Sequence, residues 1–238
     1  MAEQQQQQQQ QQKEGKQRQG KRKITFYFDI VSPFAYIAYY IFKTSPVFNQ
    51  VEITHVPVFL GGLMHATGNV APMNVKNKGK WIERERKRFT TAFQIPFSAT
   101  PIPNFPIFTL PMQRALTALS LSHPHKLDAA MDLIWQNFWA TYNEPEKPEN
   151  LRALLTTVLG SEVEAQDVME RAKSEQVKKL LTERTMRAFD EGAFGLPWFV
   201  ATNAKGESEG FWGVDYIGRL CDHLEIERPV GKQWRAVL

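Results

Sequence analysis

The sequence predicts an α/β fold in which a helical block separates two parts of one sheet. Three observations support this prediction. Strand-like runs of β-branched and aromatic residues flank a predicted helix near the N-terminus, two more such runs stand near the C-terminus, and apolar residues repeat at helical spacing between them. The predicted order is β–α–β, then helices, then β–β–α. With 238 residues, of which 42% are hydrophobic and 23% charged, the chain is long enough to bury a core.

The cysteine count and the charge exclude several kinds of protein. A single cysteine, Cys221, excludes a disulfide framework, a CxxC redox pair and a cysteine-rich zinc site, and it favours an intracellular location. The histidines have no metal-ligand spacing, so no metal is expected. The net charge of +4 lies within residues 1–23, which hold six basic and two acidic residues. The remainder is neutral, and we expect no nucleic-acid partner.

Residues 1–23 form a low-complexity segment in which residues 4–12 are all glutamine. Such a segment cannot bury enough apolar surface to offset the entropy of ordering, so we predict that it is disordered. The chain has no apolar run of about 18 residues and no apolar segment near its start. We therefore expect neither a membrane-spanning helix nor a secretory signal, and no membrane partner.

The first three elements form a predicted β–α–β unit. Residues 24–31 are β-branched and aromatic, which is typical of a buried strand. Ser32 followed by Pro33 is typical of a helix start, with serine as the N-cap and proline in the first turn. Residues 34–42 are apolar nearly all round, as in a buried helix, and a second strand is predicted over residues 51–58. This order implies a parallel strand pair with a right-handed crossover.

The next segments alternate between irregular and helical character. Residues 61–80 contain four glycines and many polar side chains, which predicts a loop. A helix is predicted over residues 81–93, and its mixed-sign run at residues 83–88 is interpreted as a solvent-exposed face. Residues 96–111 contain five prolines and are predicted to be irregular.

Residues 112–191 are predicted to be mostly helical. A helix predicted to begin with Asn150 as its N-cap ends at Gly160, and another covers residues 174–190. An apolar stripe spaced by three or four positions is interpreted as core, with a ligand pocket as the alternative. The stripe consists of Leu127, Met131, Ile134, Trp135, Phe138, Trp139 and Tyr142.

The C-terminal part is predicted to be a hairpin followed by a helix. Residues 198–202 and residues 208–212 are strand-like, and a turn at residues 204–207 joins them. Pro197 stands directly before the first of these strands, and a helix is predicted over residues 214–224.

Four segments carry a pattern that is more specific together than any one of them alone. They are residues 26–34 (FYFDIVSPF), 60–69 (LGGLMHATGN), 192–197 (GAFGLP) and 211–215 (FWGVD). In their order and spacing they resemble kappa-class glutathione transferases, and the resemblance spans residues 24–225, nearly the whole predicted folded region. The same pattern is shared with 2-hydroxychromene-2-carboxylate isomerases and, more loosely, with DsbA-like oxidoreductases.

The resemblance implies a thioredoxin-like domain with an inserted all-helical domain, as in DsbA-like proteins. On this basis residues 24–80 and 192–238 are predicted to form the thioredoxin-like domain, and residues 81–191 the helical one. The resemblance also implies glutathione as the co-substrate, a homodimer, and a mitochondrial or peroxisomal location, with the cytosol left open.

Ser32 is the predicted catalytic residue. A thiol attacks as a thiolate, and a free thiol has a pKa of about 8.5. The unpaired N–H groups and the dipole at a helix N-terminus stabilise a nearby anion, and a hydroxyl adds a hydrogen bond. A redox enzyme of this fold has cysteine here, so in this chain the thiol must come from the substrate side, and the resemblance implies that it is glutathione. The alternative is that Ser32 is only an N-cap.

The resemblance assigns the cysteinyl and γ-glutamyl parts of glutathione to two segments. The backbone of Leu196, before an expected cis Pro197, would pair with the cysteinyl part like an added strand. Asp215 would bind the γ-glutamyl amino group, with the N–H of Val214 near the γ-glutamyl carboxylate. The family often has serine where this chain has Val214. The alternatives are an ordinary trans turn proline and a capping carboxylate.

The glycine end of glutathione is assigned, again by resemblance, to Asn69 and Lys78. A lysine suits a carboxylate because it presents a compact positive charge. Lys76 and Lys80 stand close by in the sequence and are alternatives to Lys78.

The activity that the resemblance implies is a glutathione transferase acting in detoxification. The thiolate would attack a small-molecule electrophile such as an aryl halide, and hydroperoxides would be a further substrate class. We expect the electrophile to lie against the helical block, near Trp135, Trp139 and the proline-rich loop. One alternative is a glutathione-dependent isomerase, in which the thiolate adds to a conjugated system and leaves again. The other is a non-catalytic glutathione-binding module.

Overall fold

A computed structural model describes residues 20–236 and contains one four-stranded sheet in the order β2-β1-β3-β4. The strands β1 (Lys23–Phe28) and β2 (Glu52–Pro57) pair in parallel, whereas β3 (Trp198–Thr202) pairs antiparallel with both β1 and β4 (Ser208–Trp212). All four strands lie at their predicted places, and the predicted parallel pair at the start of the chain is confirmed.

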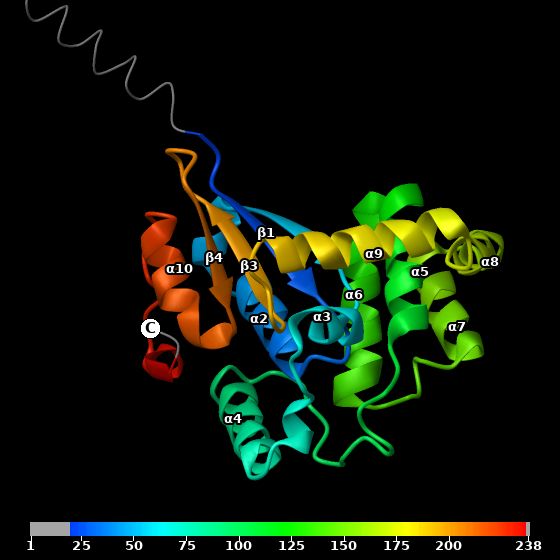
Figure 1. The fold of residues 1–238 in the computed structure, drawn as a ribbon, viewed down its shortest axis with the longest axis horizontal. Helices are drawn as coiled ribbons and strands as arrows, with labels where there is room; N and C mark the ends of the chain where they lie inside the picture. The colour runs from blue at the N-terminus through cyan, green and yellow to red at the C-terminus, as the bar shows by residue number, and fades with distance from the viewer. Residues whose placement is uncertain (1–19, 237–238) are drawn as a thin grey trace, which may run out of the picture.

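Helices surround this sheet unevenly. Figure 1 shows α5–α9 gathered to the right of the sheet, α10 to its left and α4 apart from both, and α10 contacts β3. The predicted order of β–α–β, helices and β–β–α is therefore confirmed. The helices are α2 (Pro33–Thr44), α3 (Leu60–Thr67), α4 (Lys78–Ala92), α5 (Leu110–Ser122), α6 (Leu127–Trp135), α7 (Pro148–Leu159), α8 (Glu162–Arg171), α9 (Glu175–Asp190) and α10 (Ile217–His223). The division into two domains stays a prediction.

Side chains of successive residues in β1 pack on opposite faces of the sheet. Phe26 and Phe28 belong to the larger core, whereas Tyr27 belongs to a smaller one beneath α3 and α9. Trp135 of α6 is fully buried in the larger core, where its ring lies 5.1 Å from Phe28 and 4.9 Å from Tyr39. The interpretation of the aromatic stripe as core is thus confirmed at Trp135.

A buried amide joins the helical block to the ends of the strands. The side chain of Gln113 in α5 donates hydrogen bonds to the carbonyls of Phe28, at 2.9 Å, and Val58, at 2.7 Å. Phe28 ends β1 and its carbonyl also accepts from the Val58 N–H at 3.0 Å, and Val58 directly follows β2. Because buried carbonyls need partners, this contact fixes α5 against the end of the sheet that carries the site.

The predicted loop over residues 61–80 is wrong, because much of it is helical. Residues of α3 and the first turn of α4 lie within it. Gly61 is needed for close packing: a Cβ there would come within 2.8 Å of the Phe59 ring. Gly68 ends α3 in the left-handed conformation, with φ of 69°. Both glycines therefore belong to a helix and its end, and they do not indicate an irregular loop.

Several helix boundaries also differ from prediction. Asn150 is not an N-cap: α7 begins two residues earlier, and the Asn150 amide donates to the carbonyls of Asn143 and Glu144. Gly160 ends α7 as predicted. The helix predicted over residues 174–190 is α9, which Ser174 caps, but α8 between them was not anticipated. The last helix starts as a 3-10 turn, Val214–Tyr216, before α10.

Most of the predicted disordered tail lies outside the described residues. The prediction of disorder is wrong for its last four residues, 20–23, which the structure describes in contact with the fold. The Gly20 N–H donates to the Ala204 carbonyl at 3.0 Å, and the Arg22 guanidinium donates to the Leu224 carbonyl at 2.6 Å. Lys23 opens β1. Within residues 20–236, no helix has the length and apolarity that crossing a bilayer requires.

Candidate functional site

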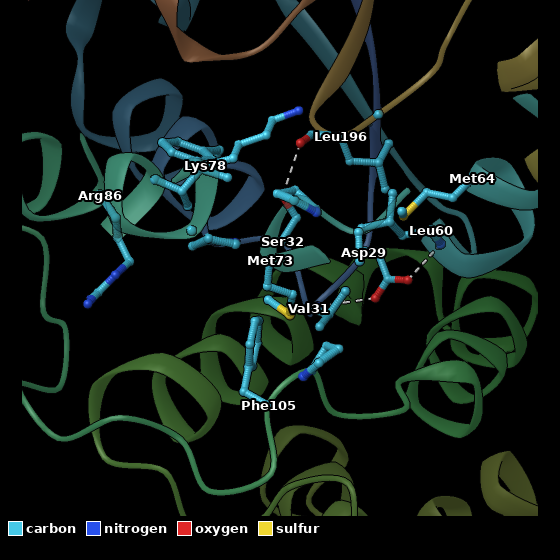
Figure 2. Close-up of a pocket in the computed structure, with 18 of the residues that line it drawn as sticks. Asp29, Val31, Ser32, Leu60, Met64, Met73, Lys78, Arg86, Phe105 and Leu196 are labelled. Carbon is cyan, nitrogen blue, oxygen red and sulfur yellow. Dashed lines mark hydrogen bonds between the residues drawn. The ribbon is translucent and has the colours of Figure 1, made fainter. Parts of the chain in front are cut away.

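A cavity of about 1130 Å³ opens where the chain leaves β1 and enters α2 (Figure 2). Its walls come from segments far apart in sequence: the α2 start, α3, the 69–73 loop, α4, the 97–109 loop, and the turns before β3 and after β4. Six of the seven predicted site residues line it. These are Ser32, Asn69, Lys78, Leu196, Val214 and Asp215, while Pro197 lies just outside the lining.

Ser32 is the N-cap of α2, as predicted. Its hydroxyl oxygen accepts a hydrogen bond from the Ala35 N–H at 3.2 Å, and its hydroxyl donates to the Leu196 carbonyl at 3.1 Å (Figure 2). Only 4% of Ser32 is exposed. The start of the 12-residue α2 therefore places a shielded hydroxyl and the positive end of a helix dipole at the cavity wall.

The turn before β3 faces Ser32. The Leu196–Pro197 peptide bond is cis, as the resemblance implied. The Pro197 carbonyl accepts from the Gly213 N–H at 3.0 Å, which ties this turn to the end of β4. The Leu196 carbonyl is directed at the cavity wall and is engaged by Ser32.

Asp29 is a cavity residue that sequence reasoning missed. Its carboxylate is fully buried and accepts three hydrogen bonds: from the Thr109 hydroxyl at 2.7 Å, the Leu60 N–H at 2.9 Å and the Val31 N–H at 3.2 Å (Figure 2). It therefore joins the starts of α3 and α5 to the turn that leads into Ser32. The sequence signal that could have found it is a single acidic residue directly after an apolar strand.

Burial of Asp29 is expected to make stability depend on pH. Burial raises the pKa of Asp29 from 3.8 to about 6, although the hydrogen bonds oppose this shift. Because the native pKa is the higher one, the stabilising contribution is complete below pH 3.8 and is lost as the pH rises through about 6. Between pH 7.5 and pH 5, the unfolding free energy of wild type should therefore rise by about 1.4 kcal/mol relative to that of Asp29→Asn, because only about one pH unit of this window lies below the native pKa.

Urea unfolding of both proteins at the two pH values measures this gain. The difference between the two proteins isolates Asp29, because every other ionisable group is present in both. An identical pH dependence in wild type and Asp29→Asn would contradict the assignment.

Asn69 and Lys78 approach the cavity from the segment between α3 and α4. The Asn69 amide donates to the Phe194 carbonyl at 2.8 Å, and its oxygen accepts from the Val70 N–H at 2.9 Å. Asn69 thus holds the turn before β3 against the end of α3. Lys78 begins α4 and lines the cavity, whereas Lys76 and Lys80 do not.

Val214 and Asp215 form the wall after β4. Val214 is buried and opens the 3-10 turn that precedes α10, following Gly213 with φ of 82°. Burial raises the pKa of Asp215, and the neighbouring Glu85 carboxylate raises it further. A carboxylate in this position favours a bound positive charge, because a cation would relieve both effects.

The rest of the cavity is mainly apolar. Trp139 and the proline-rich loop line it, whereas Trp135 does not, and the expected position of an electrophile stays a prediction. Within residues 83–88, the interpretation as a solvent-exposed face is confirmed at four exposed residues, whereas Glu85 and Arg86 are half-buried and line the cavity. The Arg86 guanidinium lies 4.2 Å from the centre of the Phe97 ring. Further apolar lining comes from Phe34, Met73, Ile82, Phe89, Ile102, Phe105 and Ile107.

These features define what the site can do chemically. A hydroxyl and the positive end of a helix dipole beside an apolar volume would stabilise an anion such as a thiolate, and more strongly than in water. Cys221 cannot supply that sulfur, because it is buried in the core, where burial raises its pKa to about 12. Across residues 20–236, no three His, Cys, Asp or Glu side chains gather as metal ligands would.

Comparison with known proteins agrees with this architecture. A family model described as a DSBA-like thioredoxin domain matches residues 23–225. Glutathione S-transferase kappa 1 of Caenorhabditis elegans is 27% identical over 214 residues, covering 87% of this chain and 93% of that protein. The 2-hydroxychromene-2-carboxylate isomerase of Sphingobium xenophagum is 23% identical, covering 85% and 98%. A solved structure of such an isomerase superposes with a TM-score of 0.69 at 22% identity, covering 85% of this chain and 94% of its own.

Proposed function

The chain belongs to the DSBA-like thioredoxin domain family, and on that premise we propose that it is a glutathione transferase. Its α/β fold, with a mixed four-stranded sheet and a helical insertion, is the DsbA-like fold. The observation that carries the proposal is Ser32, a buried hydroxyl that caps α2 beside a large apolar cavity. In the proposed reaction, Ser32 and the helix N-terminus stabilise the thiolate of glutathione, which attacks an electrophile in the apolar part.

The remaining cavity residues suit the other groups of glutathione. The Leu196 backbone would pair with the cysteinyl unit, Asp215 with the γ-glutamyl ammonium, and the N–H of Val214 with the γ-glutamyl carboxylate. This last contact needs only a backbone group, so a valine side chain can occupy the position. Lys78 and Asn69 would hold the glycine end, and Pro197 would shape the turn. Glutathione would be consumed as a co-substrate by a homodimeric detoxifying enzyme, within a mitochondrion, a peroxisome or the cytosol.

Incubation of the purified protein with glutathione and an aryl halide tests this function. We expect the thioether product to form in proportion to the glutathione consumed, and a hydroperoxide to be reduced in a parallel assay. Tight glutathione binding without turnover of either electrophile class would favour the non-catalytic binding module.

A glutathione-dependent isomerase is the second candidate, favoured by the relative from Sphingobium xenophagum. There the same thiolate would add to a conjugated system and leave again. Turnover of a 2-hydroxychromene-2-carboxylate with catalytic, unconsumed glutathione, and no conjugation of aryl halides, would favour this candidate over the transferase.

Lys78 provides a matched test of the proposed binding mode. Lys78→Met should raise the Kd for glutathione about fivefold, because it removes one partly solvated charge contact of about 1 kcal/mol. Lys80→Met should leave the Kd unchanged, since Lys80 does not line the cavity. Calorimetric titration at low salt compares the two variants, and equal effects of both would argue against the position assigned to the glycine carboxylate.

A further inference from the structure

The Ser32 hydroxyl is already engaged in the structure. It has one proton, and that proton is donated to the Leu196 carbonyl at 3.1 Å. Its oxygen simultaneously accepts from the Ala35 N–H at 3.2 Å. A hydroxyl can serve as donor to one acceptor at a time, so it cannot hold both the carbonyl and a ligand sulfur. Stabilising a thiolate therefore requires the proton to leave the carbonyl.

Releasing that proton has a cost in this location. Ser32 is 4% exposed and Leu196 is 7% exposed, so solvent is poorly placed to replace the lost hydrogen bond. A buried carbonyl without a donor is unfavourable. The bond from the Ala35 N–H can persist throughout, because it uses a lone pair of the hydroxyl oxygen. Only the partner of the Leu196 carbonyl has to change.

We propose that an amide N–H of the bound thiol takes over the Leu196 carbonyl and thereby frees the Ser32 hydroxyl to turn to the sulfur. This inference rests on the proposed function and adds a specificity rule to it. The site activates thiols in which one carbon carries both an amide N–H and the CH2–SH group, as the Cα atom of a cysteinyl peptide does. When a thiol without that N–H binds, the Ser32 hydroxyl keeps its hydrogen bond to the Leu196 carbonyl and does not turn to the sulfur. The thiol proton itself goes to solvent, and Ser32 keeps its own.

A glutathione analogue with an ester in place of the γ-glutamyl–cysteinyl amide is the test ligand. The ester removes the N–H without adding bulk. The bound thiol pKa of glutathione and of the ester is measured by thiolate absorbance on wild type and on Ser32→Ala. On wild type we expect the ester to have a bound thiol pKa about one unit higher than glutathione. On Ser32→Ala, the two ligands should have the same bound thiol pKa.

The affinities give a second, independent measurement. At low pH, where the thiol is protonated, the hydroxyl can stay on the carbonyl and both ligands should bind with similar Kd values. The Kd ratio of ester to glutathione should rise about tenfold with pH on wild type and stay flat on Ser32→Ala. Equal pKa values on wild type, a difference that persists in Ser32→Ala, or loss of ester binding at low pH would overturn the inference. If glutathione itself shows no Ser32-dependent shift, the proposed function fails instead.

Discussion

Replacing Ser32 with alanine is expected to lower kcat/KM for aryl halide conjugation about 10- to 100-fold at neutral pH. A hydrogen bond to a charged group contributes about 1.5–3 kcal/mol, and every 1.4 kcal/mol corresponds to a tenfold change. The loss should shrink as the pH rises, because at high pH the thiol ionises without help. Steady-state kinetics from pH 6 to pH 9.5 measure both the loss and its pH dependence.

Ser32→Thr is the control for this variant. Threonine keeps a hydroxyl and caps helices nearly as well as serine, so it should retain most of the activity. Ser32→Ala also removes the hydrogen bond from the Ala35 N–H, which should cost about 1 kcal/mol of stability. An equal loss of activity in both variants, or a loss in Ser32→Ala that does not change with pH, would indicate a capping role alone.

Replacing Trp135 with alanine is expected to destabilise the fold by about 3–5 kcal/mol. The side chain is fully buried among Phe28, Tyr36 and Tyr39, with ring centroids 4.9 to 5.9 Å apart. Removing it opens a large void between the sheet, α2 and α6. Urea unfolding at pH 7.5 measures the loss of unfolding free energy.

Two variants calibrate the Trp135 result. Trp135→Phe keeps most of the packing and removes an indole N–H that has no hydrogen-bond partner among the described residues, so it should cost much less than the alanine variant. Trp81→Ala alters a side chain that is 49% exposed and should change stability by less than about 1 kcal/mol. A small effect of Trp135→Ala would contradict the assignment of the stripe to the core.

The strands and the N-cap were predictable because local sequence decides them. Residues 24–31 are β-branched and aromatic, and Ser32 with Pro33 has a capping pattern that does not depend on distant contacts. The helical block was likewise predictable, because its apolar residues repeat over many turns.

The helix α3 was not predicted because tertiary packing, and not local sequence, determines it. Gly61 lowers helix propensity, yet the Phe59 ring occupies the space where its Cβ would lie. Packing overrides propensity at such positions, and the sequence pattern does not reveal the neighbour. The same limit applies to Glu85 and Arg86, because the spacing within α4 does not show that one helix face borders a cavity.

The site could be predicted only in part, and by resemblance more than by pattern. Ser32 is locally marked as a cap, whereas Leu196 lies 164 residues away and meets it only through the antiparallel pairing of β3 with β1. Asp29 was missed because nothing in its local sequence shows that Thr109 and the Leu60 N–H will surround it.

The thiol pKa of bound glutathione, measured by ultraviolet absorbance across pH on wild type and Ser32→Ala, tests the central claim most directly. The account predicts a bound thiol pKa about two units below the free value of about 8.5 on wild type. On Ser32→Ala it should return most of the way to the free value. A lowered pKa that is the same in both proteins, or no lowering in wild type, would contradict the assignment of Ser32 as the group that stabilises the thiolate.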